Sequence, residues 1–379
     1  MFLQGLQLMN LKIILICAFL ARYIIGIKKY LFGFSMLNVE PQNWWGHGYT
    51  LYVEIAKNFL DGNGLQYKAP FIETAVFARR PPLYPLLLSA QLYFFGENNY
   101  IPIFFQSFIG TATVFITYKI AEMMFEKKVA LIAAIICAFY PYYVFHDTAL
   151  QETCLHTFLT ALAFYFILKS CKKSSYLNFI LTGFFVGIGS LCKEMIIVMI
   201  PFIMIWFFFN LELKKKRKIT LIAIFICTFL ITITPYVLRN YKIYNKPIFT
   251  IGLGVRLFEG NTSNLFSYYP RQSLDVGRSL GKSKKELEKF KSMNEIEFDN
   301  WHLKKAIDFV YENPGKTIKY AFMKIGAAYS PIVNPAENKS FSRSFLYTTS
   351  YTPILILSVI GLFLSLRRWK YISLIYYFI

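Results

Sequence analysis

The feature that most constrains this chain is a series of long apolar segments separated by short loops. A helix that crosses the hydrocarbon core of a bilayer needs about 20 predominantly apolar residues. The candidate spans are Leu11–Ile27, Ile101–Ala121, Val129–Phe145, Cys154–Leu168, Tyr176–Leu191, Met195–Asn210, Ile219–Leu238 and Tyr351–Leu366. A further apolar segment begins near Tyr371 and reaches the last residue. We therefore expect a truncated chain or a short last span.

Composition supports a membrane protein. Of the 379 residues, 56% are hydrophobic and 19% aromatic, and the mean hydropathy is +0.42. A single soluble core does not bury that much apolar surface, so the chain is predicted to meet lipid. No A-x-A-like cleavage site follows Leu11–Ile27, which indicates a retained span rather than a removed signal peptide. The predicted fold class is an all-α polytopic membrane protein with about eight or nine spans.

One short apolar segment decides the predicted topology. Leu83–Phe95 has only about 13 residues and prolines at its start, so it is predicted to be an interfacial or re-entrant helix. Most lysine- and arginine-rich loops then fall on one side, which the positive-inside rule makes cytoplasmic. These loops are Glu126–Lys128, Lys169–Lys173, Lys214–Lys218 and Arg367–Lys370. The loop His146–Glu152, without Lys or Arg, falls on the outer side. The pair Lys28-Lys29 also falls on the outer side, against the positive-inside rule.

This topology divides the chain into five parts. We expect a first span at 1–27, an extracytoplasmic loop with interfacial helices at 28–100, a six-span bundle at 101–238, an extracytoplasmic segment at 239–350 and C-terminal spans at 351–379. Within the outer segments, helical spacing of apolar residues predicts helices over Leu51–Leu60, Glu295–Glu312 and Gly315–Ala328.

Several functional classes are disfavoured. The net charge of +20 comes from loops beside apolar segments, as expected for topology determinants near anionic lipid, so no nucleic-acid partner is predicted. Four histidines without an H-E-x-x-H motif give no zinc site. The glycines of Ile251–Gly254 lack the G-K-[ST] ending of a P-loop. No metal ligands are assigned, although a divalent cation stays possible.

Two carboxylates in the outer loop are candidates for chemistry. Asp147 and Glu152 are either ordinary solvated side chains or a general base facing a lipid-linked substrate. Apolar surroundings disfavour the charged form of a carboxylate, so we expect its basicity to be raised.

Basic residues at span ends are candidates for binding phosphate. Arg79 and Arg80 precede a proline pair, and a guanidinium group binds two phosphate oxygens at once, although anchoring to headgroups explains them equally well. Lys193 is either neutralised by Glu194 or is a further phosphate ligand, and Arg239 ends the span before the large outer segment.

Eight short motifs in one order resemble the bacterial branch of the dolichyl-phosphate-mannose–protein mannosyltransferase superfamily, which includes the lipid A aminoarabinose transferase and has the GT-C fold. They are Tyr52–Gly64, Arg80–Leu86, Leu150–Thr153, Gly187–Glu194, Pro235–Tyr241, Glu259–Asn261, Glu312–Pro314 and Tyr329–Pro331.

The resemblance implies a polyprenyl-phosphate sugar donor and an active site on the outer face. Glu152 stands at the family's acidic position, Arg80 at its basic position, and Lys193 and Arg239 at positions where basic residues occur. Tyr52, Glu54, Tyr84 and Asn261 are then candidates for the substrate pocket. The family's usual acid in the first loop is replaced by Gly48, so Glu54, His47 or Asp147 substitutes for it, Glu152 acts alone, or the protein is altered or inactive.

The predicted function is therefore an inverting glycosyltransferase of the cell membrane, with a glycan, lipid or protein hydroxyl as acceptor. Two alternatives remain open. One is a transporter or flippase for lipid-linked glycans, and the other is a non-catalytic relative that binds polyprenyl phosphate.

Overall fold

A computed structural model describes residues 10–31, 47–69, 72–98, 100–267, 269, 284–332 and 341–365, without the side chains of 47–50, 284–285, 341–343 and 365. The chain forms two compact units. Unit 1 contains the described residues of Met1–Gln66 and Arg80–Phe249, and unit 2 those of Tyr67–Arg79 and Thr250–Ser365.

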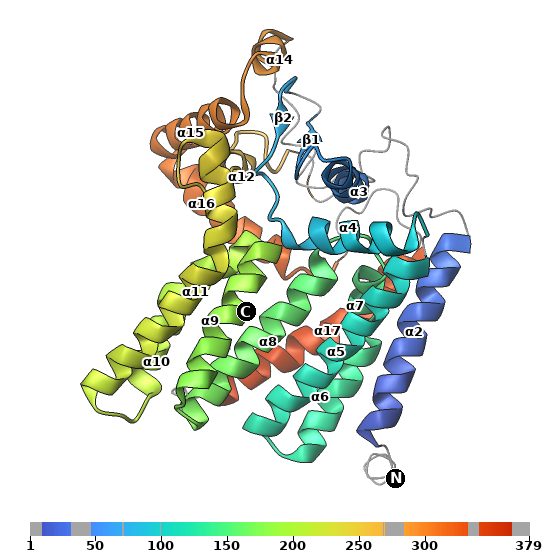
Figure 1. The fold of residues 1–379 in the computed structure, drawn as a ribbon. Coiled ribbons are helices and arrows are strands. Elements are labelled where there is room, and N and C mark those ends of the chain that lie inside the picture. The colour runs from blue at the N-terminus through green and yellow to red at the C-terminus, as the bar shows by residue number, and fades with distance from the viewer. Residues whose placement is uncertain are drawn as a thin grey trace. The chain divides into compact units, whose positions relative to one another are not determined.

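Unit 1 is helical (Figure 1). Its elements are α2 (Leu11–Leu31), α3 (His47–Leu60), α4 (Leu83–Phe95), α5 (Tyr100–Met124), α6 (Lys127–Phe139), α7 (Pro141–Asp147), α8 (Thr153–Lys172), α9 (Tyr176–Cys192), a 3₁₀ helix at Glu194–Met199, α10 (Ile200–Asn210) and α11 (Lys215–Tyr244).

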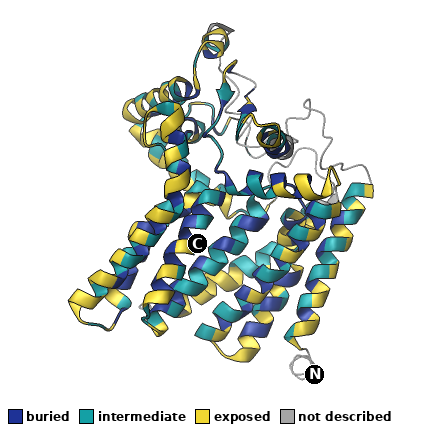
Figure 2. Cartoon of the chain, in the orientation of Figure 1, coloured by how far each residue is buried: buried dark blue, intermediate teal, exposed yellow. Residues whose placement is uncertain are grey.

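The bundle of unit 1 is held together by apolar side chains on the facing sides of its helices. Phe179 of α9, Phe207 of α10 and Phe225 of α11 are fully buried, and Phe207 packs tilted against Phe179 and edge-on against Phe225. Gly183 and Gly187, four residues apart on α9, lie against α11, where an added Cβ would collide with Phe225 and Thr232. Small residues at this spacing let two membrane helices approach closely. The buried residues follow the inner sides of the helices (Figure 2).

The predicted interfacial helix is present with the expected bounds. α4 covers Leu83–Phe95, is too short to be counted as a span, and lies across one end of the bundle (Figure 1). Pro82 stands at its N-cap, and Gly96 follows it with φ 67°, a left-handed conformation that favours glycine. Its place at the bilayer surface stays a prediction.

Four helices are long and apolar enough to cross a membrane among the described residues. They are Tyr100–Met124, Thr153–Lys172, Lys215–Tyr244 and Ser344–Leu364. A bent pair formed by Lys127–Phe139 and Pro141–Asp147, with an angle of 54°, makes a fifth if it is one span. The predicted count of eight or nine is not reached by this criterion and stays a prediction, as does α2 as the first span.

Two predicted spans are interrupted. The expected continuous helix Val129–Phe145 is broken at Tyr140, because Pro141 has no N–H to continue the hydrogen-bond ladder and instead starts α7. The expected helix Met195–Asn210 begins as a 3₁₀ turn, and its α-helical part starts only at Ile200, with Pro201 in the first turn. Proline at that position again explains the break.

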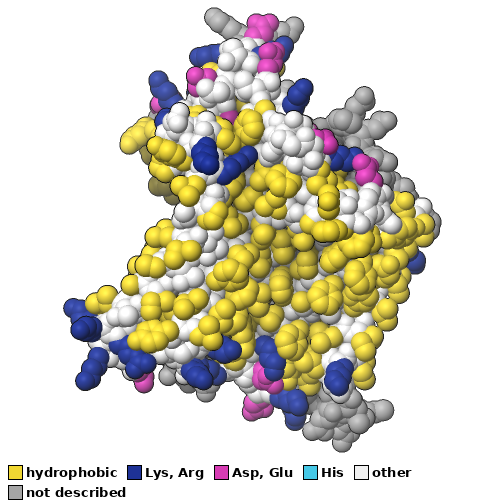
Figure 3. All heavy atoms as spheres, in the orientation of Figure 1, with side chains coloured by type: hydrophobic (Ala, Val, Ile, Leu, Met, Phe, Trp, Pro, Cys, Tyr) yellow, Lys and Arg dark blue, Asp and Glu magenta, His cyan; other side chains and the backbone are white. Residues whose placement is uncertain are grey.

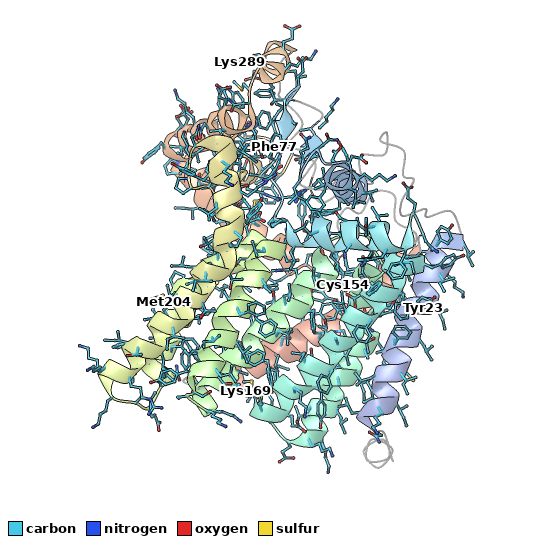
Figure 4. All side chains as sticks on the ribbon, in the orientation of Figure 1. Tyr23, Phe77, Cys154, Lys169, Met204 and Lys289 are labelled. Atoms are coloured by element: carbon cyan, nitrogen blue, oxygen red, sulfur yellow. The ribbon has the colours of Figure 1, made fainter. Side chains whose placement is uncertain are left out.

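The two ends of the bundle differ in charge. Lys and Arg side chains gather at the end formed by the α5–α6, α8–α9 and α10–α11 loops (Figure 3). Cys154 and Lys169 mark opposite ends of α8, and Cys154 lies at the end away from these loops (Figure 4). Glu152 directly precedes α8 and therefore lies at the end opposite the basic loops.

Unit 2 departs slightly from the all-α prediction. It contains an antiparallel strand pair, β1 (Tyr67–Lys68) and β2 (Ala75–Val76), in which Tyr67 faces Val76. Its helices are α12 (Leu253–Gly260), α14 (Lys284–Lys291), α15 (Glu295–Glu312), α16 (Pro314–Ala328) and α17 (Phe341–Ser365).

Helix α15 organises unit 2. Asn294 and Glu297 form a capping box at its start, which accounts for the predicted boundary at Glu295. The Asp299 carboxylate accepts hydrogen bonds from the backbone N–H groups of Gly254 and Val255, in the first turn of α12. Glu295 accepts from the backbone of Phe77, next to β2.

Candidate active site

The outer-loop carboxylate predicted from the sequence lies in a polar cluster of unit 1. Glu152 Oε2 accepts a hydrogen bond of 2.7 Å from the Tyr52 hydroxyl, and Glu152 Oε1 lies 3.1 Å from Lys193 Nζ. The Glu152 side chain is 13% exposed and that of Lys193 is 31% exposed. The carboxylate is thus largely enclosed but still reachable beside the lysine.

Four chain segments build this cluster. Tyr52 comes from the buried side of α3, Glu152 from the N-terminus of α8, and Lys193 from the extended residue that ends α9. The guanidinium carbon of Arg80 lies 5.8 Å from the centre of the Tyr52 ring, in cation–π geometry. The structure therefore brings together Arg80, Lys193, Glu152 and Tyr52, all of which are candidates from the sequence.

The charge state of Glu152 differs from the sequence prediction. Burial raises the pKa of this carboxyl, but the attraction of Lys193, the hydrogen bond from Tyr52 and the attraction of Arg80 lower it, and the pKa lies below its ordinary value of 4.5. The expectation of raised basicity was wrong because it considered the apolar surroundings and not the cations. Glu152 is therefore ionised at neutral pH.

A second tyrosine supports the first. Tyr84 of α4 packs edge-on against Tyr52 with ring centres 5.0 Å apart. Its hydroxyl donates to Gln106 Oε1 at 2.9 Å, and Gln106 Nε2 donates to the backbone carbonyls of Asp147 and Ala149. Gln106 thus ties α4 and α5 to the turn that carries Glu152. Burial raises the pKa of both tyrosines well above 10, so each is a neutral hydrogen-bond donor.

The Asp147 carboxylate forms an ion pair with Arg22 and not with the residues around Glu152. Its carboxylate Oδ2 lies 2.7 Å from Arg22 Nε of α2, and both side chains are almost fully buried. Arg22 also donates to the carbonyls of Ala138 and Cys137. Asp147 thus fixes α2 against the α6–α7 bend, and its carboxylate is not brought to Glu152. Sequence reasoning missed Arg22, although an arginine inside the apolar segment Leu11–Ile27 signals a buried partner.

The lysine pair that disagreed with the predicted topology has a local explanation. Lys29 Nζ donates to the Phe145 carbonyl at 2.9 Å and to Thr148 Oγ1 at 2.6 Å, and it lies over the Phe145 ring. Lys29 therefore binds the C-terminal end of α7, where carbonyl groups favour a cation. A residue with such specific contacts is poor evidence about membrane sidedness.

The consecutive arginines Arg79 and Arg80 belong to different units and have different contacts. Arg80 belongs to unit 1, whereas Arg79 belongs to unit 2 and lies over the Phe298 ring at 6.0 Å. Arg239, in unit 1, donates to the Leu65 carbonyl at 2.9 Å and to Asn240. Of the predicted phosphate ligands, Arg80 and Lys193 approach Glu152, and Arg79 and Arg239 make these other contacts.

Among the described side chains, those of the remaining residues predicted for the site are not seen in contact with Glu152. Glu54 is exposed on α3, while Tyr52 faces inward. His47 begins α3, but its side chain lies outside the described ones. Asn261 belongs to unit 2, where it donates to the Leu257 carbonyl at the end of α12. Across the described part of the chain, no three His, Cys, Asp or Glu side chains are grouped to hold a metal ion.

Comparisons with known proteins match the segment that carries this cluster. Residues 79–238 match the family model described as dolichyl-phosphate-mannose-protein mannosyltransferase. This match confirms the resemblance inferred from the sequence motifs. Arg80, Glu152 and Lys193 lie inside the matched segment, whereas Tyr52 precedes it.

A curated relative agrees with the family model. The undecaprenyl phosphate-alpha-4-amino-4-deoxy-L-arabinose arabinosyl transferase of Wigglesworthia glossinidia brevipalpis is 23% identical over 195 residues, which is 49% of this chain. The aligned part covers 34% of that relative, so the chain spans about a third of its length.

Proposed function

We propose that this protein is a membrane glycosyltransferase that moves a sugar from a polyprenyl-phosphate donor to an acceptor hydroxyl. The observation that carries the proposal is the enclosed Glu152 carboxylate, held by Tyr52 and Lys193 beside the Arg80 guanidinium. A base next to two cations is the arrangement that transfer from a phosphate-linked sugar needs. The matched family and the arabinosyl transferase support the same class of reaction.

The proposed reaction is a single displacement. The acceptor oxygen forms a bond to the anomeric carbon while the bond from that carbon to the donor phosphate breaks. Polyprenyl phosphate leaves with the electron pair, and Glu152 takes the proton of the acceptor hydroxyl. Lys193 and Arg80 stabilise the negative charge that grows on the leaving phosphate. One displacement of this kind inverts the anomeric centre.

The low pKa of Glu152 is compatible with a role as general base only if donor binding raises that pKa. The donor phosphate is an anion, so it would compete with Glu152 for Lys193 and Arg80. Because these two cations lower the pKa of Glu152, sharing them with the phosphate raises that pKa and improves the base. Donor binding would thus activate Glu152.

We further propose that the reaction takes place at the extracytoplasmic face of the cell membrane. Glu152 precedes α8 at its Cys154 end, which is opposite the basic loops (Figure 4), and basic loops favour the cytoplasm. The donor sugar and the acceptor are assigned only by class: a polyprenyl-phosphate sugar, and a glycan, lipid or protein hydroxyl.

The decisive experiment uses the full chain in nanodiscs with radiolabelled polyprenyl-phosphate sugars and candidate acceptors. We expect labelled acceptor and released polyprenyl phosphate, in equal amounts, with wild-type protein and little of either with Glu152→Gln. Donor binding without transfer by the wild type would contradict the enzyme and favour a binding protein. Movement of intact donor between leaflets in liposomes, without transfer, would instead favour a flippase.

A further inference from the structure

Helix α16 of unit 2 turns its polar side inward. Tyr320 stacks on Phe309 with ring centres 6.2 Å apart and donates its hydroxyl to the Ser263 carbonyl. Lys324 Nζ donates to the Gly260 carbonyl at 3.0 Å. These contacts fix which side of α16 faces the rest of unit 2.

The opposite side of α16 is an exposed apolar stripe. Ile318, Phe322, Ile325 and Tyr329 are 61%, 71%, 56% and 40% exposed, and no residue of α16 is buried. Their spacing of four, three and four residues places them on one side of a helix. Helices at the surface of a soluble domain normally have the reverse orientation, with the apolar side inward. The stripe therefore requires an apolar environment outside unit 2.

The charges on α16 favour an anionic bilayer surface as this apolar environment. α16 contains Lys316, Lys319 and Lys324 and no acidic residue, and Lys316 and Lys319 are exposed. Lys319 borders the apolar stripe, and a basic helix with such a stripe is typical of helices that lie in the interface of an anionic bilayer.

Residues 330–331, just after α16, are hydrogen-bonded to a candidate span. Tyr347 donates its hydroxyl to the Ser330 carbonyl at 3.3 Å, and Thr348 Oγ1 donates to the Pro331 carbonyl at 2.9 Å. Both donors lie in the first turns of the apolar window Ser344–Leu364. If that window enters the bilayer, residues 330–331 lie at its boundary, and α16 ends within a few residues of it.

We propose that α16 is an interfacial helix that docks on an anionic bilayer surface. Ile318, Phe322, Ile325 and Tyr329 insert into the boundary between headgroups and acyl chains, and Lys319, beside the stripe, contacts the phosphates. This anchor is independent of catalysis, and it holds unit 2 at the membrane that contains α17.

The test is a depth measurement on the full chain in nanodiscs of phosphatidylglycerol and phosphatidylcholine. The background replaces the two exposed cysteines, Cys17 and Cys227, by alanine. Phe322→Cys carries an environment-sensitive fluorophore, and Ile318→Cys repeats the measurement at a second position of the stripe. Lys316→Cys, on the other side of the helix, is the matched control.

We expect blue-shifted emission at residues 322 and 318 and at least twofold quenching by lipids with a nitroxide near the headgroup, with little of either at residue 316. Water-like emission at 322 and 318 would overturn the proposal. Blue-shifted emission without lipid quenching would also overturn it, because the stripe would then be covered by protein. The stripe signals should weaken in pure phosphatidylcholine, and equal quenching there would contradict the role of Lys319.

Discussion

The Tyr52 hydroxyl donates to the Glu152 carboxylate across 2.7 Å, although 100 residues separate the two in sequence. This contact joins the first loop to the turn before α8. It places a neutral donor on the carboxylate from one side while Lys193 approaches from the other. The arrangement explains why the pKa of Glu152 is lowered although burial acts to raise it, and it makes the role of each neighbour testable.

Glu152→Gln should lower transfer by about 10²–10⁴-fold, the usual contribution of one general base. Glutamine keeps the shape and the hydrogen bond from Tyr52 but accepts no proton. Turnover of a radiolabelled lipid-linked sugar measures the loss. Glu54→Gln, which changes an exposed carboxylate on α3, is the control and should keep near wild-type turnover. Full activity of the Glu152 variant would remove this residue from the reaction.

Lys193→Ala should move the acidic limb of the pH–rate profile to higher pH. Lys193 is the first of the causes that lower the pKa of Glu152, so without it burial dominates and the carboxyl protonates at a higher pH. In the wild type, the stability contributed by ionised Glu152 is lost as the pH falls through its lowered pKa, and the alanine variant should lack this contribution. Lys193→Arg keeps the charge and should leave the limb near its wild-type position. A profile that is unchanged in the alanine variant would contradict the coupling.

Arg80→Ala should weaken use of the donor by about tenfold or more, since a charge-assisted hydrogen bond contributes roughly 1.5–3 kcal/mol. The expected effect is a higher KM for donor, with normal membrane insertion. Arg79→Ala is the matched comparison, because Arg79 contacts Phe298 in unit 2 and not the Glu152 cluster. Equal defects in both variants would indicate that the arginines serve a common structural role.

Tyr52→Phe removes one hydroxyl and keeps the ring that packs on Tyr84. The carboxylate of Glu152 then loses the hydrogen bond that holds it in one orientation, so the base is less well positioned. We expect transfer to fall by roughly tenfold, consistent with about 1.5 kcal/mol for a hydrogen bond to a charged group. Thermal unfolding in detergent should change little, and a large loss of stability would show that the hydroxyl is mainly structural.

Arg22→Leu should destabilise the protein by about 3–5 kcal/mol, because it leaves the Asp147 carboxylate buried without its cation. The double variant Arg22→Leu with Asp147→Asn removes both charges and should recover much of that loss. Thermal unfolding of detergent-purified protein compares the two. A single variant as stable as wild type would show that the pair is dispensable for folding.

Local sequence rules anticipated the elements whose ends are set locally. The bounds of α15 follow from Asn294 and Glu297 at its start and from Asn313-Pro314 at its end. The length of α4 follows from its prolines and Gly96. The break at Tyr140 was missed because the apolar run continues across Pro141, and hydropathy alone does not register a missing N–H.

Long-range pairing was harder to anticipate. Asp147 and Glu152 look alike in sequence, yet one faces Arg22 and the other faces Lys193 and Tyr52. The local polarity of the loop does not distinguish them, and only the motif Leu150–Thr153 sets Glu152 apart. The predicted direction of the Glu152 pKa shift was wrong for the same reason. The cations that lower this pKa belong to segments that meet only in the folded chain.

The position of Glu152 immediately before α8 has an electrostatic consequence. The aligned peptide dipoles of a helix place about half a positive charge at its N-terminus, carried by backbone N–H groups without helical acceptors. Glu152 is the residue that precedes the first turn, and its side chain makes no capping hydrogen bond to that turn. The field of a 20-residue helix thus adds to the two cations and keeps this corner of the fold attractive to an incoming anion, even while the carboxylate is ionised.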